Sequence, residues 1–309
     1  MNGMEWLVPV IMTVITASTP LLFAATGELL TEKSGVLNLG VEGMMLVGAV
    51  SAFATASITG SGALAILAGA VSGALMALIF AFLTLTLLAN QVATGLSLTI
   101  FGVGFSALVG SGFVGYSLKP LPRLDLPVIS DIPFIGPLIF GHDFLVYLSF
   151  FGVFAVGWFL SRTHWGMVLR AVGDSHDSAH AIGYNVIRIR YMATLFGGAM
   201  AGLGGAYLSL SYTPMWAEGM TSGRGWIALA LVVFATWRPG RLLLGAYMFG
   251  GITILQLHAQ GVGIAIPSQF MSMLPYLATI FVLVLISRDI TKIRLNAPAC
   301  IGQAFRPAH

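Results

Sequence analysis

The chain has 309 residues, of which 57% are hydrophobic and only 8% are charged, and its mean hydropathy is +0.93. A soluble domain carries roughly a quarter charged residues, so this composition excludes a soluble globular protein and indicates a polytopic membrane protein. The single cysteine excludes an intramolecular disulfide and a zinc site of clustered thiolates. The net charge of +3 does not indicate nucleic-acid binding, because Lys and Arg in membrane proteins mainly mark the cytoplasmic loops.

The predicted fold class is all-α, with one transmembrane domain over residues 1–309. A helix needs ~20 apolar residues to cross ~30 Å of hydrocarbon, which leaves room for about nine spans, and for eight to ten at the limits. The seventh is short and is expected to be broken or tilted. The expected spans are Met4–Thr26, Gly43–Ile58, Gly62–Leu88, Val92–Gly112, Phe144–Leu160, Tyr191–Tyr212, Trp226–Trp237, Leu242–His258 and Phe270–Ser287.

The segment Thr31–Met45 places polar residues directly between two long apolar runs, where a polar group without a partner is expensive. Glu32 and Lys33 are expected near the cytoplasmic surface, where they cost little. Asn38 and Glu42 are one helical turn apart and can share a face, on a glycine-flanked segment that we expect to be a half-helix. Glu42 either braces this interrupted helix, through Lys33 or a set of N-terminal amides, or contacts a solute.

Further candidates for solute contact lie at the start of two later spans. Asn90, Gln91 and Thr94 open the fourth, and Trp226 opens the seventh. Their amides and indole ring offer hydrogen bonds and a stacking surface to a planar polar ligand. The alternative is an interfacial position of the tryptophans, which is the simpler interpretation for Trp226 and the stronger one for Trp237.

Two connections are longer than the others. Residues 113–143 contain five prolines, which forbid a continuous helix, and we expect an ordered external loop. Residues 161–190 carry mixed charge around an alanine-rich stretch suited to one short helix that ends at Gly183. We interpret this cytoplasmic segment as a docking surface for a partner rather than as a solvated loop.

The sequence HDSAH, with His176 and His180 four residues apart, resembles the zinc-binding HExxH pattern. Asp177 replaces the glutamate of that pattern, and a third ligand is not evident. We therefore expect no metal here and interpret the two histidines as part of a polar helix face.

The distribution of basic residues predicts the orientation in the membrane. Counting spans alternately from an external N-terminus places all Lys and Arg on one side except Lys119, Arg123 and Arg224. Basic residues concentrate in cytoplasmic loops. The N-terminus is therefore expected outside, and the C-terminus and residues 161–190 in the cytoplasm.

Glycine is abundant, with 38 residues, and it recurs at small-residue spacings such as Gly69 with Gly73 and Gly198 with Gly202. Such spacing favours close helix packing, with flexibility at moving interfaces as the alternative. The repeated triplets Glu42–Met44 and Glu218–Met220 each precede an apolar run. They are a faint sign of two pseudo-repeated halves, which many transporters possess.

Six segments, in order along nearly the whole chain, resemble those of a known family: Thr19–Ala49, Ser130–Leu138, Arg170–Tyr191, Gly197–Leu210, Gly223–Pro239 and Arg294–Phe305. They are similar to segments of permease subunits of bacterial ABC importers in the branched-chain amino acid, simple-sugar and nucleoside superfamily. The similarity is greatest to the nucleoside-type permeases paired with basic-membrane-lipoprotein binding proteins.

The resemblance implies a type II importer permease that works with a second permease, in a homo- or heterodimer, two cytoplasmic ABC ATPases and an external binding protein or lipoprotein. The chain has no phosphate-binding loop of its own, so ATP and Mg would be bound by the ATPase. The resemblance places the coupling helix at about Gly173–Gly183, and the residues expected to couple to the ATPase are Arg170, Gly173, Asp174, Asp177, Ala179 and Gly183.

Two departures from the family pattern affect these expectations. The family's coupling helix usually has an acidic or Asn-Pro pair and two adjacent alanines, whereas this chain has Ser175–His180 there, so the choice of partner can differ. Asn90 stands where an aspartate usually opens the fourth span, which makes the substrate class less certain.

The resulting hypothesis is a permease in the bacterial inner membrane that imports a nucleoside or nucleobase-like solute by alternating access. The expected solute contacts are Asn38, Glu42, Asn90, Gln91, Thr94 and Trp226. A simple sugar or a riboflavin-like molecule is the alternative substrate. A stand-alone secondary transporter or channel, with Glu42 and Glu218 as proton carriers, is the alternative of another class, and an intramembrane hydrolase is the third.

Overall fold

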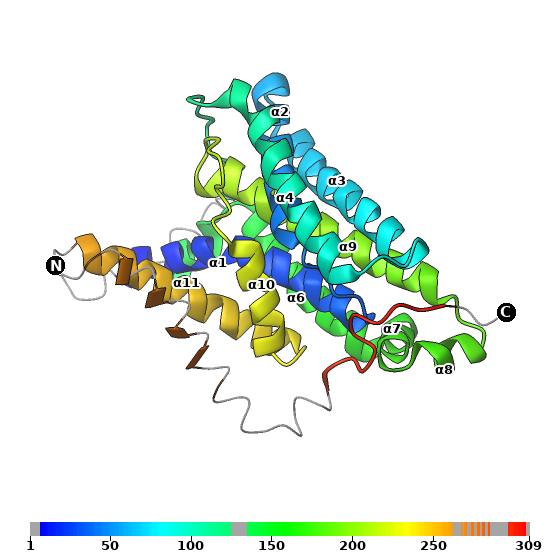
Figure 1. Cartoon of the computed structure of the whole chain (residues 1–309). Helices are drawn as coiled ribbons and strands as arrows, with labels where there is room; N and C mark the ends of the chain where they lie inside the picture. Colours follow the sequence, from blue (N-terminus) through cyan, green and yellow to red (C-terminus); the bar gives the residue numbers. More distant parts are fainter. Residues whose placement is uncertain are drawn as a thin grey trace.

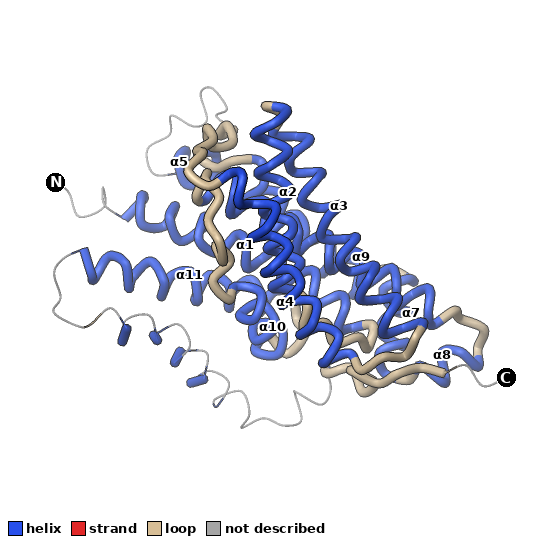
Figure 2. Tube along the Cα trace, turned by 45° about the horizontal axis from the view of Figure 1, so that its top comes forward, coloured by secondary structure: helices blue, strands red, loops and turns tan. Residues whose placement is uncertain are grey.

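The computed structural model describes residues 7–124, 135–261 and 296–306, together with isolated positions between 267 and 284. Helices make up nearly all of this part of the chain (Figure 1). Its only extended pairings are two isolated bridges, Ser117 with Met215 and Arg123 with Asp143, and no strand is seen among the described residues (Figure 2). The predicted all-α class is confirmed for these residues.

Within the described ranges, seven helices are long and apolar enough to cross a membrane. Shorter helices connect them, and π-helical turns prolong two of them. The long helices are α1 (Leu7–Lys33), α2 (Val41–Thr59), α3 (Gly62–Ala81), α4 (Gln91–Gly110), α6 (Phe144–Arg162), α9 (Val186–Tyr207) and α11 (Pro239–Gly261). The shorter elements are η1 (Phe82–Thr86), η2 (Ser111–Phe113), α5 (Ile135–Phe140), α7 (His164–Asp174), α8 (His176–Ala181), η3 (Leu208–Tyr212) and α10 (Arg224–Phe234).

Seven of the predicted spans correspond to these long helices. The seventh prediction, Trp226–Trp237, falls on α10, which has 11 residues and a length of only ~16 Å, too short to cross the hydrocarbon. The ninth, Phe270–Ser287, lies largely outside the described residues. The count of about nine spans therefore stays a prediction.

Two expectations at the first connection are wrong. Helix α1 continues past Thr26 to Lys33, so that Glu32, expected at the surface, is only 1% exposed. It tolerates burial because the Trp237 indole N–H donates to its Oε2 at 2.6 Å, and Trp237 is itself buried rather than interfacial. Residues 34–40 form turns instead of a half-helix, because Gly35 takes a φ of +87°.

Helix α9 is the centre of the bundle and packs against α1, α2 and α3, as Figure 1 shows for α3 and α9. The contacts run through the glycine pairs noted in the sequence. A Cβ atom added at Gly73 would overlap the backbone of Gly198 and Gly202, and one added at Gly202 would overlap Gly69. The interpretation of these spacings as tight helix packing is confirmed.

Most of the short elements lie at the two ends of the bundle, whereas α10 lies between them (Figure 1). At one end, the described parts of the 113–143 loop lie against the segment after η3, where the Leu118 N–H donates to the Pro214 carbonyl at 2.9 Å. Asp143 caps α6 there and accepts a hydrogen bond from Ser211. At the other end, α7 and α8 lie beside the described C-terminal segment (Figures 1 and 2).

Candidate functional site

Asn38 organises the turns between α1 and α2. Its side chain is fully buried, and its Oδ1 accepts the Gly40 N–H at 3.0 Å while its Nδ2 donates to the Met44 sulfur at 3.4 Å. Its own N–H donates to Glu28 Oε1 at 3.2 Å. Asn and Asp side chains commonly stabilise turns in this way. Every polar group of Asn38 named here is therefore engaged in holding the segment 34–40.

Glu42 binds the start of α10. Its Oε1 accepts the Thr221 hydroxyl at 2.5 Å and the Gly223 N–H at 2.9 Å, and its Oε2 accepts the Gly225 N–H at 2.6 Å. A carboxylate at this position satisfies amides that have no partner within the helix and interacts favourably with the helix dipole. This is the bracing geometry through N-terminal amides that the sequence offered as one interpretation of Glu42.

Helix α4 encloses the turns from another side. Gln91 is buried, and its Oε1 accepts the Leu37 N–H at 2.8 Å. The Thr99 hydroxyl donates to the Leu39 carbonyl at 3.0 Å. Gly95 allows this close approach, because a Cβ there would lie 2.8 Å from the Leu39 nitrogen. Segment 34–40 is thus held between α4 and the region where Glu42 meets α10.

The other predicted solute contacts differ in how much surface they expose. Asn90 is exposed, and its Oδ1 caps α4 by accepting the Ala93 N–H at 3.0 Å. Thr94 is half-buried one turn later, and Trp226 is exposed in the first turn of α10. The buried Gln91 Nε2 has no hydrogen-bond partner among the described residues. A solute can reach Asn90 and Trp226 without displacing a contact that holds the segment 34–40.

The predicted coupling segment contains two helices rather than one. Gly173 and Asp174 end α7, whereas Asp177 and Ala179 belong to α8. Gly183 ends the second helix as expected, since it takes a φ of +94° and donates its N–H to the His180 carbonyl at 2.9 Å. The chain can break between the helices because the Ser175 hydroxyl caps α8.

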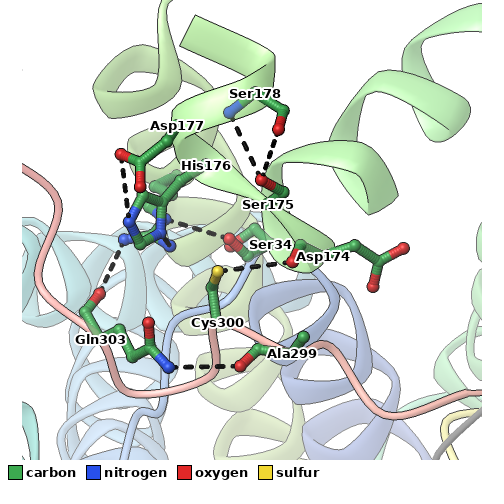
Figure 3. A network of polar contacts seen from close by, with 10 residues as sticks. Ser34, Asp174, Ser175, His176, Asp177, Ser178, Ala299, Cys300 and Gln303 are labelled. Atoms are coloured by element: carbon green, nitrogen blue, oxygen red, sulfur yellow. Dashed lines mark hydrogen bonds and ion pairs between the residues drawn. The ribbon is translucent and has the colours of Figure 1, made fainter.

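The coupling residues also divide by exposure. Asp174, Asp177 and Gly183 are exposed, Arg170 is half-buried, and Gly173 and Ala179 are buried. Gly173 is required by packing, because a Cβ there would overlap the Lys33 carbonyl. Only the exposed members can form a contact surface for a partner. The Asp174 side chain points away from His176, Cys300 and Gln303, which lie beside it in Figure 3.

The C-terminal segment 296–306 fastens the coupling helices to the rest of the molecule. The Cys300 N–H donates to the Gly173 carbonyl at 2.9 Å, and the Gly302 N–H donates to the Gly35 carbonyl at 3.1 Å. Figure 3 shows Cys300 and Gln303 of this segment next to Ser34, Asp174 and His176. In the sequence these residues stand out only through the family resemblance. Their role as a C-terminal strap, the name used below for segment 296–306, depends on contacts between distant parts of the chain.

Arg190 is the centre of this cluster and was missed as a structural residue. It is 1% exposed, and it donates to the Ser34 carbonyl at 3.1 Å, the Gln303 carbonyl at 3.0 Å and His176 Nδ1 at 3.3 Å. One side chain thereby connects α9, the 34–40 turns, the C-terminal strap and α8. The coupling helices and the solute-contact candidates are joined through the segment 34–40.

His176 and His180 both pack against the described C-terminal segment. Both rings meet Phe305 edge-on, with centroid distances of 5.2 and 5.4 Å. Within the described ranges no group of three potential metal ligands is found. Burial lowers the pKa of His176, and the nearby Arg190 charge adds to this effect.

Comparison with known proteins gives matches along most of the chain. Residues 10–285 match the family described as branched-chain amino acid transport system / permease component. The chain is 39% identical to the "Putative glucose ABC transporter permease protein TsgC13" of Haloferax volcanii, over 94% of this chain and 95% of that protein. It is 32% identical to the nucleoside ABC transporter permease protein NupC of Lactococcus lactis, over 92% and 94%, and 29% identical to the guanosine ABC transporter permease protein NupQ of Bacillus subtilis, over 86% and 88%. No solved structure matches significantly.

Proposed function

Because the chain belongs to the family of branched-chain amino acid transport system permease components, we propose that it is the membrane subunit of a type II ABC importer with pseudo-repeated halves. It passes a small polar solute inward by alternating access. The observation that carries this proposal is the interrupted segment 34–40, held by α4 and by the contact of Glu42 with α10. Buried irregular backbone must have its polar groups bonded by protein, as Gln91 bonds the Leu37 N–H here.

The proposed solute contacts have two kinds of role. Asn90, Thr94 and Trp226 offer accessible polar and aromatic groups, and Gln91 Nε2 is a buried donor without a partner among the described residues. Asn38 and Glu42 stay among the predicted contacts, but their hydrogen bonds to the protein favour a role in shaping the path beside the solute.

A nucleoside or nucleobase-like molecule is the proposed substrate class. The exposed indole of Trp226 suits stacking on a planar base, and two of the relatives are named for nucleosides or guanosine. A simple sugar is the second candidate, because the relative that is 39% identical is named for glucose. Riboflavin-like molecules also remain a candidate from the family resemblance.

Competition in reconstituted vesicles separates these substrates. The permease, its second permease, the ATPases and the binding protein are assembled together, and ATP-driven uptake of labelled guanosine is measured. Unlabelled guanosine should suppress uptake while glucose does not. Trp226→Phe, which keeps a stacking surface, should retain more uptake than Trp226→Ala. Uptake of glucose that guanosine does not inhibit would replace the nucleoside assignment by the sugar.

The energy source is proposed to be ATP hydrolysis on the partner ATPase, which binds ATP and Mg. The rival is a stand-alone secondary transporter or channel that uses Glu42 and Glu218. Glu42 is occupied by three hydrogen bonds, and Glu218 is exposed in a turn, so the geometry does not favour a buried proton relay. Uptake that persists when the ATPase is inactivated would contradict ATP-driven import.

The proposed location is the bacterial inner membrane, with the N-terminus outside and the C-terminus in the cytoplasm. The exposed parts of α7 and α8 then face the ATPases, and the 113–143 loop faces the external binding protein. A second permease, identical or different, completes the solute path. The observation that supports this orientation is the gathering of α7, α8 and the C-terminal strap at one end of the bundle (Figure 1).

A further inference from the structure

An apolar groove of about 950 Å³ runs along the bundle between α6 and α9. Its walls include Phe151, Ala155 and Phe159 from α6, and Met192 and Phe196 from α9. Phe151 is 67% exposed and Met192 is 64% exposed, so the groove opens to the surroundings of the bundle. It is separate from the interrupted segment and from the exposed acidic residues of the coupling helices.

One end of the groove is polar and cationic. Arg188, Asn185, Tyr184 and Trp165 line it at the level of α7 and the start of α9. The Arg188 guanidinium is exposed, and no residue in the described ranges forms an ion pair or hydrogen bond with it. Trp165 is 61% exposed, as expected of a side chain at the boundary between lipid and water. The groove therefore changes from charged to apolar along its length.

The length of the groove matches the depth of a membrane leaflet. Arg188 and Leu203 both line it and both belong to α9, and their separation along the helix corresponds to ~22 Å at 1.5 Å per residue. One leaflet together with its headgroup region contributes about half of the ~40–45 Å total bilayer thickness. An acyl chain entering beside Arg188 can therefore run along the apolar walls for the depth of its leaflet.

We propose that this groove binds an anionic phospholipid from the leaflet that adjoins α7 and α8, with its phosphate at Arg188 and an acyl chain between α6 and α9. Basic pockets between transmembrane helices on the cytoplasmic side suit anionic headgroups, and an Arg guanidinium binds phosphate through paired donors. Only the cytoplasmic sidedness rests on the proposed function. The binding of a lipid does not depend on which solute is transported.

The test measures lipid retained by the purified full chain. The protein is exchanged into detergent with equal amounts of phosphatidylglycerol and phosphatidylcholine, and bound lipid is counted by native mass spectrometry. The wild-type chain should retain phosphatidylglycerol preferentially. Arg188→Gln should reduce that preference by about fivefold, since a basic residue near an anionic membrane surface contributes on that order. Arg162→Gln is the matched control, because Arg162 is exposed at the end of α6 but does not line the groove.

A second variant tests the apolar part of the groove. Ala155→Phe adds volume between the walls and should reduce retention of both lipids, while circular dichroism and gel filtration report whether the chain remains folded. Equal losses of preference in Arg188→Gln and Arg162→Gln would overturn the proposal, because general surface charge would then explain binding. Unchanged retention in folded Ala155→Phe would also overturn it. Disulfide-linked dimers of Ala155→Cys in a Cys300→Ser background would do the same, because the groove would then face a second copy of this chain.

Discussion

Arg190 carries a buried positive charge that carbonyl groups and an imidazole satisfy. None of the described carboxylates forms an ion pair with it, and its donors reach the Ser34 and Gln303 carbonyls and His176 Nδ1. Guanidinium can only donate, so His176 must keep Nδ1 unprotonated. A charge so enclosed is expensive to leave without partners, which couples the position of the C-terminal strap to the protonation of one histidine.

The stability of the chain should depend on pH through His176. Burial and the charge of Arg190 lower the pKa of His176 below the ordinary value of 6.5, and Asp177, 3.6 Å from Nε2, opposes the shift only in part. The folded state thus binds fewer protons than the unfolded state as the pH falls through 6.5. The contribution of neutral His176 to the stability of the fold is therefore present above pH 6.5 and is lost as the pH falls below that value. Thermal unfolding in detergent between about pH 7.5 and 5.5 should show the decline.

His176→Asn is the matched control for this effect. Its side-chain oxygen can accept from Arg190 in place of Nδ1 but does not titrate in this range. The variant should therefore unfold with a weaker dependence on pH over the same interval. The same decline in both proteins would assign the pH dependence to other groups, such as His142, whose pKa burial also lowers.

Glu42 allows a test of bracing against solute contact. Glu42→Gln keeps one carbonyl oxygen but loses the charge and places an NH₂ group near the three donors that the carboxylate accepts. We expect a loss of about 2 kcal/mol in the free energy of unfolding, in the range of hydrogen bonds to charged groups. Glu218→Gln, at an exposed position, should change stability little. Unfolding is measured without solute; full stability of Glu42→Gln with loss of uptake alone would favour direct solute contact.

The sequence identified important polar residues more reliably than it predicted their contacts. Asn38 and Glu42 stood out because they interrupt apolar runs, and both are buried and bonded. Arg188 and Arg190 read alike in the sequence, yet positions two apart on a helix lie about 200° apart, and only packing with the C-terminal strap decides which one is buried. Likewise, the burial of Glu32 depends on a hydrogen bond from Trp237, a partner 205 positions away.

At the scale of elements, α7 and α8 present acidic side chains on a short helical pair. Asp177 is 83% exposed at its side chain and is not needed to hold α8, which Ser175 caps. A change at Asp177 that alters ATPase behaviour would therefore act through the partner rather than through the fold. Gly183 differs, because its φ of +94° disfavours any residue with a side chain even though nothing lies within 4 Å of an added Cβ.

Reversing the charge of Asp177 should uncouple ATP hydrolysis from transport. Asp177→Lys should keep the free energy of unfolding within about 0.5 kcal/mol, as for most surface substitutions, while lowering co-purification of the ATPases and the ratio of solute moved to ATP hydrolysed. Glu218→Lys makes the same charge change in an exposed turn outside α7 and α8 and should retain the ATPases. Normal coupled transport by Asp177→Lys, and also by a bulky replacement of Gly183, would refute the docking role.

Local pattern predicted most helices but not their interruptions. Apolar length located the spans, and glycine spacing predicted close helix packing, which the structure shows between α3 and α9. The turns at 34–40 were expected to be a half-helix, because the sequence does not show that Asn38 bonds back to Gly40. The break between α7 and α8 was also missed, although Ser175 is a typical helix cap. The free energies of ending a helix at a cap and of continuing it differ little. Contacts with distant parts of the chain therefore decide which of the two occurs.

At the scale of the whole molecule, several basic residues gather at one end of the bundle. Arg162 ends α6, Lys33 ends α1 and donates to the Asn296 carbonyl at 2.5 Å, and Arg190 lies near the start of α9. These positions share the end of the bundle that carries α7 and α8. The positive-inside tendency therefore favours a cytoplasmic location for all of them at once, and an inverted chain would place this whole set outside.

The sidedness can be tested with single cysteines, because the natural chain has only Cys300. In a Cys300→Ser background, Ile182→Cys lies beyond α8 at a position that is 72% exposed, and Lys119→Cys lies at an exposed position of the 113–143 loop. A membrane-impermeant maleimide should label Lys119→Cys in intact cells and Ile182→Cys only in inside-out vesicles. Permeabilised cells should label both, which controls for reactivity. Labelling of Ile182→Cys from outside would reverse the orientation and exclude α7 and α8 as the docking surface for a cytoplasmic ATPase.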